Sequence, residues 1–195
     1  MLRLQLATDP RWATLVESNL QEVLTDHAFC EQKAASTAIS LIVHYPEMAE
    51  LVTEMAALAR EEMEHFQRVH AIILTRGWQL GRERKDEYVI KLKTFVRTGG
   101  SRIAHLVEKL LFSAMIEARS CERFRVLSEN LEDKELAAFY NELMISEAGH
   151  YTMFLAMARS YGKQESIDVD SRWKEFLAFE ASVIAQFGTS EQIHG

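Results

Sequence analysis

The sequence contains few of the residues that interrupt helices or cross-link chains, with only two prolines and two cysteines among 195 residues. Cys30 and Cys121 are too few for a disulfide framework and lack the paired spacing of a zinc site, so we expect two reduced thiols. No apolar run approaches the roughly 18 residues that a membrane span needs, so we expect no membrane partner.

The N-terminal residues lack a basic segment followed by an apolar block and a small-residue cleavage site, the pattern that is typical of a secretion signal. We therefore expect a cytoplasmic protein. Apolar residues make up 48% of the chain and charged residues 26%, an ordinary balance for a globular protein. The length predicts one domain, residues 1–195, with a sizeable core.

Charge is unevenly distributed along the chain. The net charge is −7, which argues against a protein that coats nucleic acid indiscriminately. Residues 76–102, however, contain eight basic and three acidic residues, a local charge of +5 that leaves −12 for the remainder. Such a basic segment indicates a local anionic partner or a solvated, charged loop.

Apolar residues recur at alternating spacings of four and three through most of the chain, which is the periodicity of one helix face. The first such run predicts a helix over about 18–44, and the second follows Pro46 and ends near Gly77. The turn between them, near 45–46, is very short. We therefore expect an antiparallel hairpin.

A second hairpin is predicted from the same periodicity. Its first helix begins with Ser101 as a cap, a turn follows near 131, and the second helix ends at Gly162. A fifth helix is expected near 171–187. Since the connection over about 77–100 is long, the order is that of an all-α, ferritin-like four-helix bundle with a long crossover and an additional C-terminal helix.

A Glu-x-x-His spacing occurs twice, as Glu62 with His65 and as Glu147 with His150. The spacing of three places both side chains on one helix face. One copy is a weak signal, because Glu and His are common on solvated faces. Each copy, however, has a glutamate on the neighbouring helix of its hairpin, at Glu31 or Glu117.

The residue counts place these glutamates at matching levels. Glu31 lies about 15 residues before the first turn and Glu62 about 16 after it, so at ~1.5 Å per residue the two are at the same height. Glu117 and Glu147 lie 14 and 16 residues from position 131. Both hairpins are therefore expected to bring together two carboxylates and an imidazole.

Four carboxylates on faces that should be buried need compensation, because a buried unpaired charge costs several kcal/mol. Two divalent cations would compensate them, so the pattern predicts a dinuclear metal site. Imidazole and carboxylate donors suit iron, our first choice, or manganese, and the lack of thiolates argues against zinc. The predicted ligands, with no catalytic residue beyond them, are Glu31, Glu62, His65, Glu117, Glu147 and His150.

Three further residues lie beside the predicted ligands. Glu61 is placed to accept a hydrogen bond from an imidazole nitrogen. His27 faces inward one turn before Glu31, where a hydrogen-bonded core histidine is more common than a ligand. Gly149, a helix-interior glycine beside His150, would make room for a substrate or for close helix approach.

The ligands alone leave the reaction open. A reduced iron pair that activates oxygen can hydroxylate a C–H bond, oxidise ferrous iron for storage, or reduce peroxide. The main alternative to a hydroxylase is therefore a ferritin-like ferroxidase or peroxidase with no RNA substrate.

Four stretches of the sequence resemble a known family. They are DHAFCEQKAASTA (26–38), REEMEHF (60–66), IEARSCERF (116–124) and SEAGHY (146–151), and the similarity covers nearly the whole chain. Their pattern is similar to the bacterial tRNA hydroxylases that act on 2-methylthio-N6-isopentenyladenosine beside the anticodon. The short ligand motifs occur in many ferritin-like proteins, whereas CEQKAAST and IEARSCERF are more specific to these hydroxylases.

The resemblance implies a non-haem di-iron monooxygenase that hydroxylates the isopentenyl group of the modified tRNA with O2 and two electrons. It implies the same six metal ligands. Nothing in the sequence resembles a flavin or iron–sulfur site, so an external donor of the reductase or ferredoxin type is implied. The basic segment then becomes a candidate for binding tRNA phosphates through Arg82, Arg84, Lys85, Lys91, Lys93 and Arg97.

Overall fold

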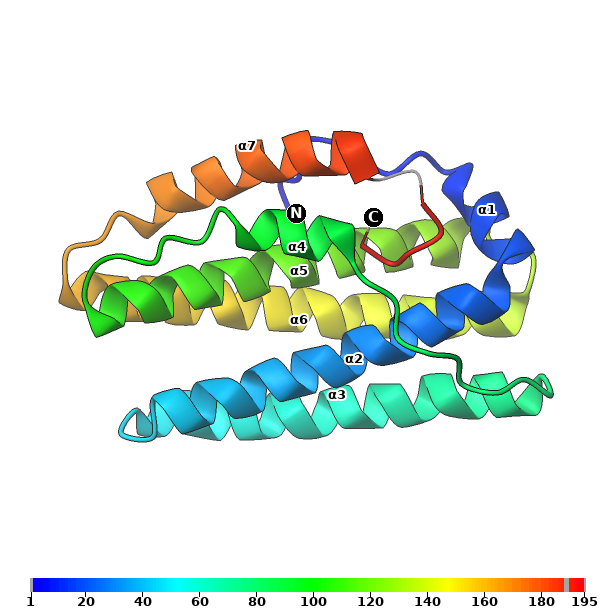
Figure 1. The fold of residues 1–195 in the computed structure, drawn as a ribbon, viewed down its shortest axis with the longest axis horizontal. Helices are drawn as coiled ribbons and strands as arrows, with labels where there is room; N and C mark the ends of the chain where they lie inside the picture. The colour runs from blue at the N-terminus through cyan, green and yellow to red at the C-terminus, as the bar shows by residue number, and fades with distance from the viewer. Residues whose placement is uncertain (1, 188–189, 195) are drawn as a thin grey trace. The chain divides into compact units, whose positions relative to one another are not determined.

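The computed structural model describes residues 2–187 and 190–194, and within them the chain forms seven helices and no strand (Figure 1). This confirms the predicted all-α class. None of these helices is long and apolar enough to cross a membrane. The helices are α1 (Trp12–Ser18), α2 (Leu20–His44), α3 (Ala49–Thr75), α4 (Glu87–Lys93), α5 (Arg102–Asn130), α6 (Lys134–Gln164) and α7 (Val169–Phe187).

The chain divides into two compact units. Of the described residues, the α2–α3 unit contains 16–85 and 191–193, and the α5–α6 unit contains 2–15, 86–187, 190 and 194. The expectation that residues 1–195 form a single domain stays a prediction.

The α2–α3 unit is the first predicted hairpin, with α2 lying alongside α3 (Figure 1). A turn over 45–48 reverses the chain, and Met48 N–H donates to the Tyr45 carbonyl at 3.1 Å. After α3, Gly77 takes a φ of +74°, a left-handed conformation that glycine adopts without strain. Both helices bury the faces that the periodicity predicted.

The α5–α6 unit contains the second hairpin, and α4 and α7 pack against α5. The predicted cap is present, since Ser101 Oγ accepts from the Ala104 N–H at 3.0 Å. Asp133 caps α6 in the same way, accepting from the N–H groups of Glu135 and Leu136 at 3.1 and 3.0 Å. Such caps fix where each helix begins, and each contributes about 1 kcal/mol.

A buried ionic network ties α5 to α7 and to the N-terminal segment. The Arg119 guanidinium donates to Glu180 on α7 at 2.6 and 2.9 Å and to Glu122 at 2.9 Å. Glu122 also accepts from the N–H and the hydroxyl of Thr8, at 2.9 and 2.6 Å, and the Tyr88 hydroxyl donates to Glu180 at 3.1 Å. Since each buried charge contacts an opposite one, the usual penalty for burying it is offset.

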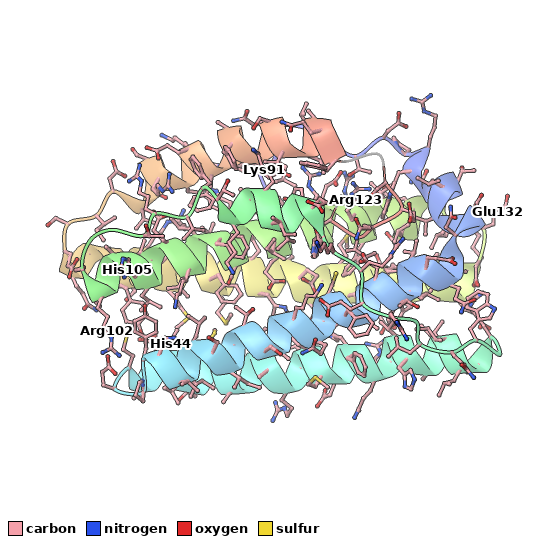
Figure 2. The ribbon with its side chains drawn as sticks, viewed as in Figure 1. His44, Lys91, Arg102, His105, Arg123 and Glu132 are labelled. Carbon is pink, nitrogen blue, oxygen red and sulfur yellow. The ribbon has the colours of Figure 1, made fainter. Side chains whose placement is uncertain are left out.

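Arg123, which is labelled in Figure 2, is the other fully buried arginine of α5, and it stacks on an aromatic ring. Its guanidinium carbon lies 4.1 Å from the centre of the Trp12 ring, a cation–π contact. Burial lowers the pKa of Arg123 to about 10, so it remains charged at neutral pH. The segment IEARSCERF thus contains the residues that fasten α5 to the N-terminal segment.

Two features differ from the sequence-based expectation. The long connection contains α4, whose first turn is capped by Asp86 Oδ1, which accepts from the Val89 N–H at 2.8 Å. In addition, α6 continues past Gly162 to Gln164. A Cβ at Gly162 would lie 2.5 Å from Val169 Cγ2, so this glycine allows the start of α7 to approach α6 closely. Gly162 therefore serves helix packing, and the helix itself ends two residues later.

The close approach at Gly162 can be tested by stability measurements. Gly162→Ala should lower the free energy of unfolding by about 1 kcal/mol, because overpacking costs about 1–3 kcal/mol while helix propensity returns up to about 1. The control is Gly149→Ala, at an exposed position of the same helix where an added Cβ would meet nothing within 4 Å. This variant should be more stable than the parent by up to about 1 kcal/mol. Urea unfolding measures both changes, and a stabilised Gly162→Ala variant would contradict the contact with Val169.

Candidate metal centre

The α2–α3 unit brings together Glu31 on α2 with Glu62 and His65 on α3. All three side chains are buried, and one donor atom of each lies within 4.8 Å of those of the other two. His65 Nδ1 is 3.5 Å from Glu62 Oε2 and 3.9 Å from Glu31 Oε2. The short turn between the helices therefore places the three residues at one level, as the residue counts predicted.

The α5–α6 unit brings together Glu117 on α5 with Glu147 and His150 on α6. These side chains are also buried, and their donor atoms likewise lie within 4.8 Å of one another. His150 Nδ1 is 3.8 Å from Glu117 Oε2. Both units thus repeat one arrangement, in which a histidine turns Nδ1 towards the glutamate of the neighbouring helix.

The chemistry of each group fits a divalent metal ion. Each offers two carboxylates and one imidazole, a donor set that suits iron or manganese. A divalent ion would compensate the charge of the two carboxylates, which is costly to bury otherwise. We refer to Glu31, Glu62 and His65 as the first triad. The second triad consists of Glu117, Glu147 and His150.

His27 contacts the first triad directly. It is fully buried, and its Nε2 lies 2.6 Å from Glu31 Oε1. The sequence predicted a hydrogen-bonded core histidine at this position, and the bond fixes the orientation of the Glu31 carboxylate. The corresponding position of the second hairpin, four residues before Glu117, is Ser113. The surroundings of the two triads therefore differ.

Glu61 lies on the other side of the His65 ring. Its Oε1 is 3.9 Å from His65 Nε2, beyond hydrogen-bond distance, and its side chain is 45% exposed. The structure therefore places Glu61 beside the nitrogen that faces away from Glu31 and Glu62, but not in a direct hydrogen bond with it.

Two of the six basic residues proposed for tRNA are held in ion pairs within their own unit. Arg84 contacts Glu191, and Arg97 contacts Glu175 with 2.8 Å between nitrogen and oxygen. The Arg97 N–H also donates to Glu108 at 3.0 Å. These contacts support a structural role for both arginines.

The other four basic residues are exposed. Arg82 and Lys85 belong to the α2–α3 unit, whereas Lys91, labelled in Figure 2, and Lys93 lie on α4 in the α5–α6 unit. Their ammonium and guanidinium groups are therefore accessible to an anionic partner.

One buried polar cluster was not predicted from the sequence. His194 Nδ1 lies 2.9 Å from Asp86 Oδ2, and its Nε2 lies 3.1 Å from Ser120 Oγ. The order Ser, His, Asp is that of a hydrolase triad, but all three side chains are buried and a substrate would not reach the serine. We therefore assign the cluster a structural role in holding residue 194 against α5. His194 lies outside any predicted helix, so helical periodicity could not indicate its role.

A family model and two curated relatives indicate the same family. The family model described as tRNA-(MS[2]IO[6]A)-hydroxylase (MiaE) matches residues 2–195. The chain belongs to this hydroxylase family. Two curated relatives, from Pseudomonas putida and Salmonella typhimurium, are each named tRNA 2-(methylsulfanyl)-N(6)-isopentenyladenosine(37) hydroxylase.

The relatives match most of the chain. The P. putida protein is 40% identical over 160 residues, which cover 82% of this chain and 77% of the relative. The S. typhimurium protein is 30% identical over 213 aligned positions, covering 85% of this chain and 77% of the relative. Membership of the family makes this protein an enzyme, as the sequence predicted.

A solved structure confirms the ferritin-like fold class. It is described as protein 43 with aldehyde deformylating oxygenase activity from Synechococcus, and it superimposes with a TM-score of 0.89 at 30% sequence identity. The match covers 98% of this chain and 95% of the solved one.

The two cysteines should differ in reactivity. Burial raises the pKa of Cys121 to about 11, so it stays a thiol at neutral pH, whereas Cys30 is only half-buried. Iodoacetamide at pH 8 should alkylate Cys30 faster, and the rate at Cys121 should rise as the pH approaches about 11, because the thiolate is the nucleophile. Peptide mass spectrometry measures both rates. Equal rates at pH 8 would contradict the burial of Cys121.

Proposed function

We propose that this protein is an iron-dependent monooxygenase that hydroxylates the isopentenyl group of 2-(methylsulfanyl)-N6-isopentenyladenosine, next to the anticodon of tRNA. The observation that carries the proposal is the repeated Glu, Glu, His triad in a chain that belongs to a tRNA hydroxylase family. The names of both curated relatives specify this nucleoside and support it as the substrate.

In this proposal the two triads supply the six ligands of a dinuclear iron centre, with three ligands from each unit. When bound, the iron pair would pass two electrons from the donor to O2, so that, with two protons, one oxygen atom would be inserted into the C–H bond and the other would leave as water. We favour iron over manganese. Because no stretch of the sequence resembles a flavin or iron–sulfur site, we propose that the electrons come from an external donor of the reductase or ferredoxin type.

The protein's own residues prepare the triads for this role. Each histidine turns Nδ1 towards the glutamates of its triad. In the first triad, His65 Nδ1 lies 3.5 Å from an oxygen of Glu62 and 3.9 Å from an oxygen of Glu31. The bond from His27 holds the Glu31 carboxylate in one orientation. Burial of all six side chains keeps bulk water from competing for the metal ions.

We further propose that the exposed basic residues bind tRNA phosphates. Arg82, Lys85, Lys91 and Lys93 are exposed, and phosphate contacts dominate the affinity of most nucleic-acid complexes. Arg84 and Arg97 remain part of the proposed set, but both also pair with acidic side chains, so the other four residues give the clearer test.

Hydroxylation can be tested on tRNA that carries the prenylated, methylthiolated adenosine. After incubation with iron-loaded protein, a reductant and O2, nucleoside mass spectrometry should show a gain of one oxygen atom. Glu62→Ala and Glu117→Ala should each lower the rate at least a hundredfold and reduce the bound iron, because each removes a ligand. The matched control is Glu64→Ala on α3, where the side chain is 64% exposed, and its rate should equal that of the parent.

Two outcomes would contradict the proposal. An iron-loaded protein that adds no oxygen to this tRNA, yet oxidises ferrous iron or reduces peroxide, would favour the ferroxidase or peroxidase alternative. Full activity of Glu62→Ala and Glu117→Ala would remove the triads from the reaction.

The phosphate contacts can be tested by charge reversal. Arg82→Glu with Lys85→Glu, and separately Lys91→Glu with Lys93→Glu, should weaken tRNA binding at least tenfold at low salt and flatten its salt dependence, since each lost contact removes about 0.7–0.9 from the logarithmic slope. Lys163→Glu with Lys174→Glu makes the same change in net charge at two other exposed positions. If this control weakens binding equally, the effect is one of net charge and the assignment to the basic segment is wrong.

A further inference from the structure

Trp78 and Arg76 form a pair at the C-terminal end of α3. The Arg76 guanidinium carbon lies 5.8 Å from the centre of the Trp78 ring, a cation–π contact. Of the three tryptophans in the chain, Trp78 alone is partly exposed, whereas Trp12 and Trp173 are buried. The α2–α3 unit therefore presents an aromatic ring and a cation together at its surface.

The backbone holds Trp78 in a fixed place. The Gly77 N–H donates to the Leu74 carbonyl at 2.9 Å, and the Trp78 N–H donates to the Ile73 carbonyl at 3.1 Å. With the left-handed φ of +74° at Gly77, these two bonds form a Schellman motif, which turns the chain back against the last turn of the helix. Trp78 is therefore anchored by α3 although it lies outside that helix.

The chain beyond Trp78 is fastened to α2. The side chain of Gln21 donates to the Gln79 carbonyl at 3.4 Å, and the Gly81 N–H donates to Thr25 Oγ1, also at 3.4 Å. Both contacts join the segment after Trp78 to the helix that precedes α3. The tryptophan thus lies on a segment that is held at both ends.

The surroundings of the pair are basic. Residues 76–85 contain four basic residues and one acidic residue, a local charge of +3. The acidic residue, Glu83, contacts Lys33 with 3.0 Å between nitrogen and oxygen. The exposed Arg82 follows Trp78 by four residues, and four residues of extended chain span at most about 14 Å. Arg82 and Trp78 are therefore close enough to contact nearby nucleotides of one strand.

An exposed aromatic ring beside cations is suited to an unpaired nucleotide. The bases of single-stranded loops stack on aromatic side chains and on arginine planes, whereas the bases of a duplex are already stacked on one another. Such stacking tolerates any base and acts together with contacts to the phosphates. The pair therefore fits an unpaired base of an RNA better than it fits a duplex or a simple anion.

The distance from the first triad limits which base this is. Trp78 is bonded to Ile73, which is 11 residues beyond Glu62 on the same helix. At ~1.5 Å per residue the two positions are about 16 Å apart along the helix axis. A base that stacks on Trp78 is therefore a different one from the adenosine whose isopentenyl group reaches the triads.

We propose that Trp78, with Arg76 beside it, is a stacking platform for an unpaired base of the anticodon loop other than the modified adenosine. The proposal rests on the proposed function, which supplies the tRNA. It adds to the phosphate contacts a residue that recognises the loop itself, because only an unpaired base can stack on the ring.

An RNA stem-loop tests the platform without catalysis. The probe is an unmodified anticodon stem-loop, and the comparison is the same RNA with abasic nucleotides in the loop, which keeps the phosphates and removes the bases. In the absence of reductant, the full-length protein should bind the intact loop at least fivefold more tightly, since the stacking of one base changes affinity by about fivefold or more. Equal affinities would overturn the proposal.

Substitutions at position 78 separate stacking from apolar packing. Trp78→Leu keeps an apolar side chain without a ring, so it should weaken binding of the intact loop at least fivefold, leave the salt dependence unchanged and bind the abasic loop as the parent does. Trp78→Phe should stay within threefold of the parent. The control is Val43→Ala on α2, where the side chain is 69% exposed, and its affinity should equal that of the parent.

Two results with these variants would overturn the proposal. One is a folded Trp78→Leu variant that binds the intact loop as tightly as the parent does. The other is a Trp78→Phe variant that loses as much affinity as Trp78→Leu, because the effect would then not depend on an aromatic ring.

A scan of the RNA keeps the test independent of how well the variants fold. With the parent protein, single abasic nucleotides outside the modified position should include at least one that weakens binding fivefold or more, and a scan with no such position would overturn the proposal. Should Trp78→Leu unfold, Arg76→Gln is the second variant, because its side chain is exposed. It should reduce the effect of that same abasic position, and an unchanged effect would remove Arg76 from the platform.

Failure of this proposal can be separated from failure of the proposed function. If the parent hydroxylates tRNA and folded Trp78→Leu does so with unchanged kcat/KM, the function stands and Trp78 is not a platform for the loop. If the parent distinguishes the intact loop from the abasic one through Trp78 but adds no oxygen to tRNA, the platform stands and the hydroxylase function fails.

Discussion

The charge of a carboxylate buried inside a helical protein must be compensated. In this protein the buried glutamates fall into two classes, according to whether an arginine or a histidine lies beside them. Glu180 and Glu122 contact Arg119, and Glu108 accepts from Arg172 at 2.7 and 2.8 Å. The glutamates of the two triads instead have imidazoles nearby. Arginine cannot give up its proton and fixes a permanent ion pair, whereas a neutral imidazole is itself a metal ligand. The first class therefore holds helices together, and the second offers the donor types that iron or manganese takes.

The two hairpins repeat the triad but not what surrounds it. His27 bonds to Glu31 in one unit, while Ser113 occupies the corresponding position before Glu117 in the other. A hydrogen bond to a ligand carboxylate changes its basicity and orientation. If both triads bind metal ions as proposed, the two ions would therefore be held with different strength even though the donor sets match.

The triads could be predicted from the sequence because their geometry is local. Helical periodicity fixes which residues share a face, and a short turn fixes the level at which Glu31 meets Glu62. Features that depend on distant contacts could not be predicted in this way. The helix α4 lies within a charged segment, and Gly162 makes room for Val169 of the next helix. Arg119 bonds to Glu180 and Thr8, which are 61 and 111 residues away in the sequence. Periodicity carries no information about such pairs.

The three tryptophans are divided unequally between the two units. Trp12 and Trp173 are buried in the α5–α6 unit, at 5% and 4% exposure, and Trp12 is stacked by Arg123 and donates from its indole nitrogen to the Ser190 carbonyl at 2.8 Å. Trp78, in the α2–α3 unit, is partly exposed. Indole emission shifts to longer wavelength when the ring meets water, so the largest change in intrinsic fluorescence comes from opening of the α5–α6 unit. The wavelength of tryptophan emission can therefore distinguish unfolding of the α5–α6 unit from unfolding of the α2–α3 unit.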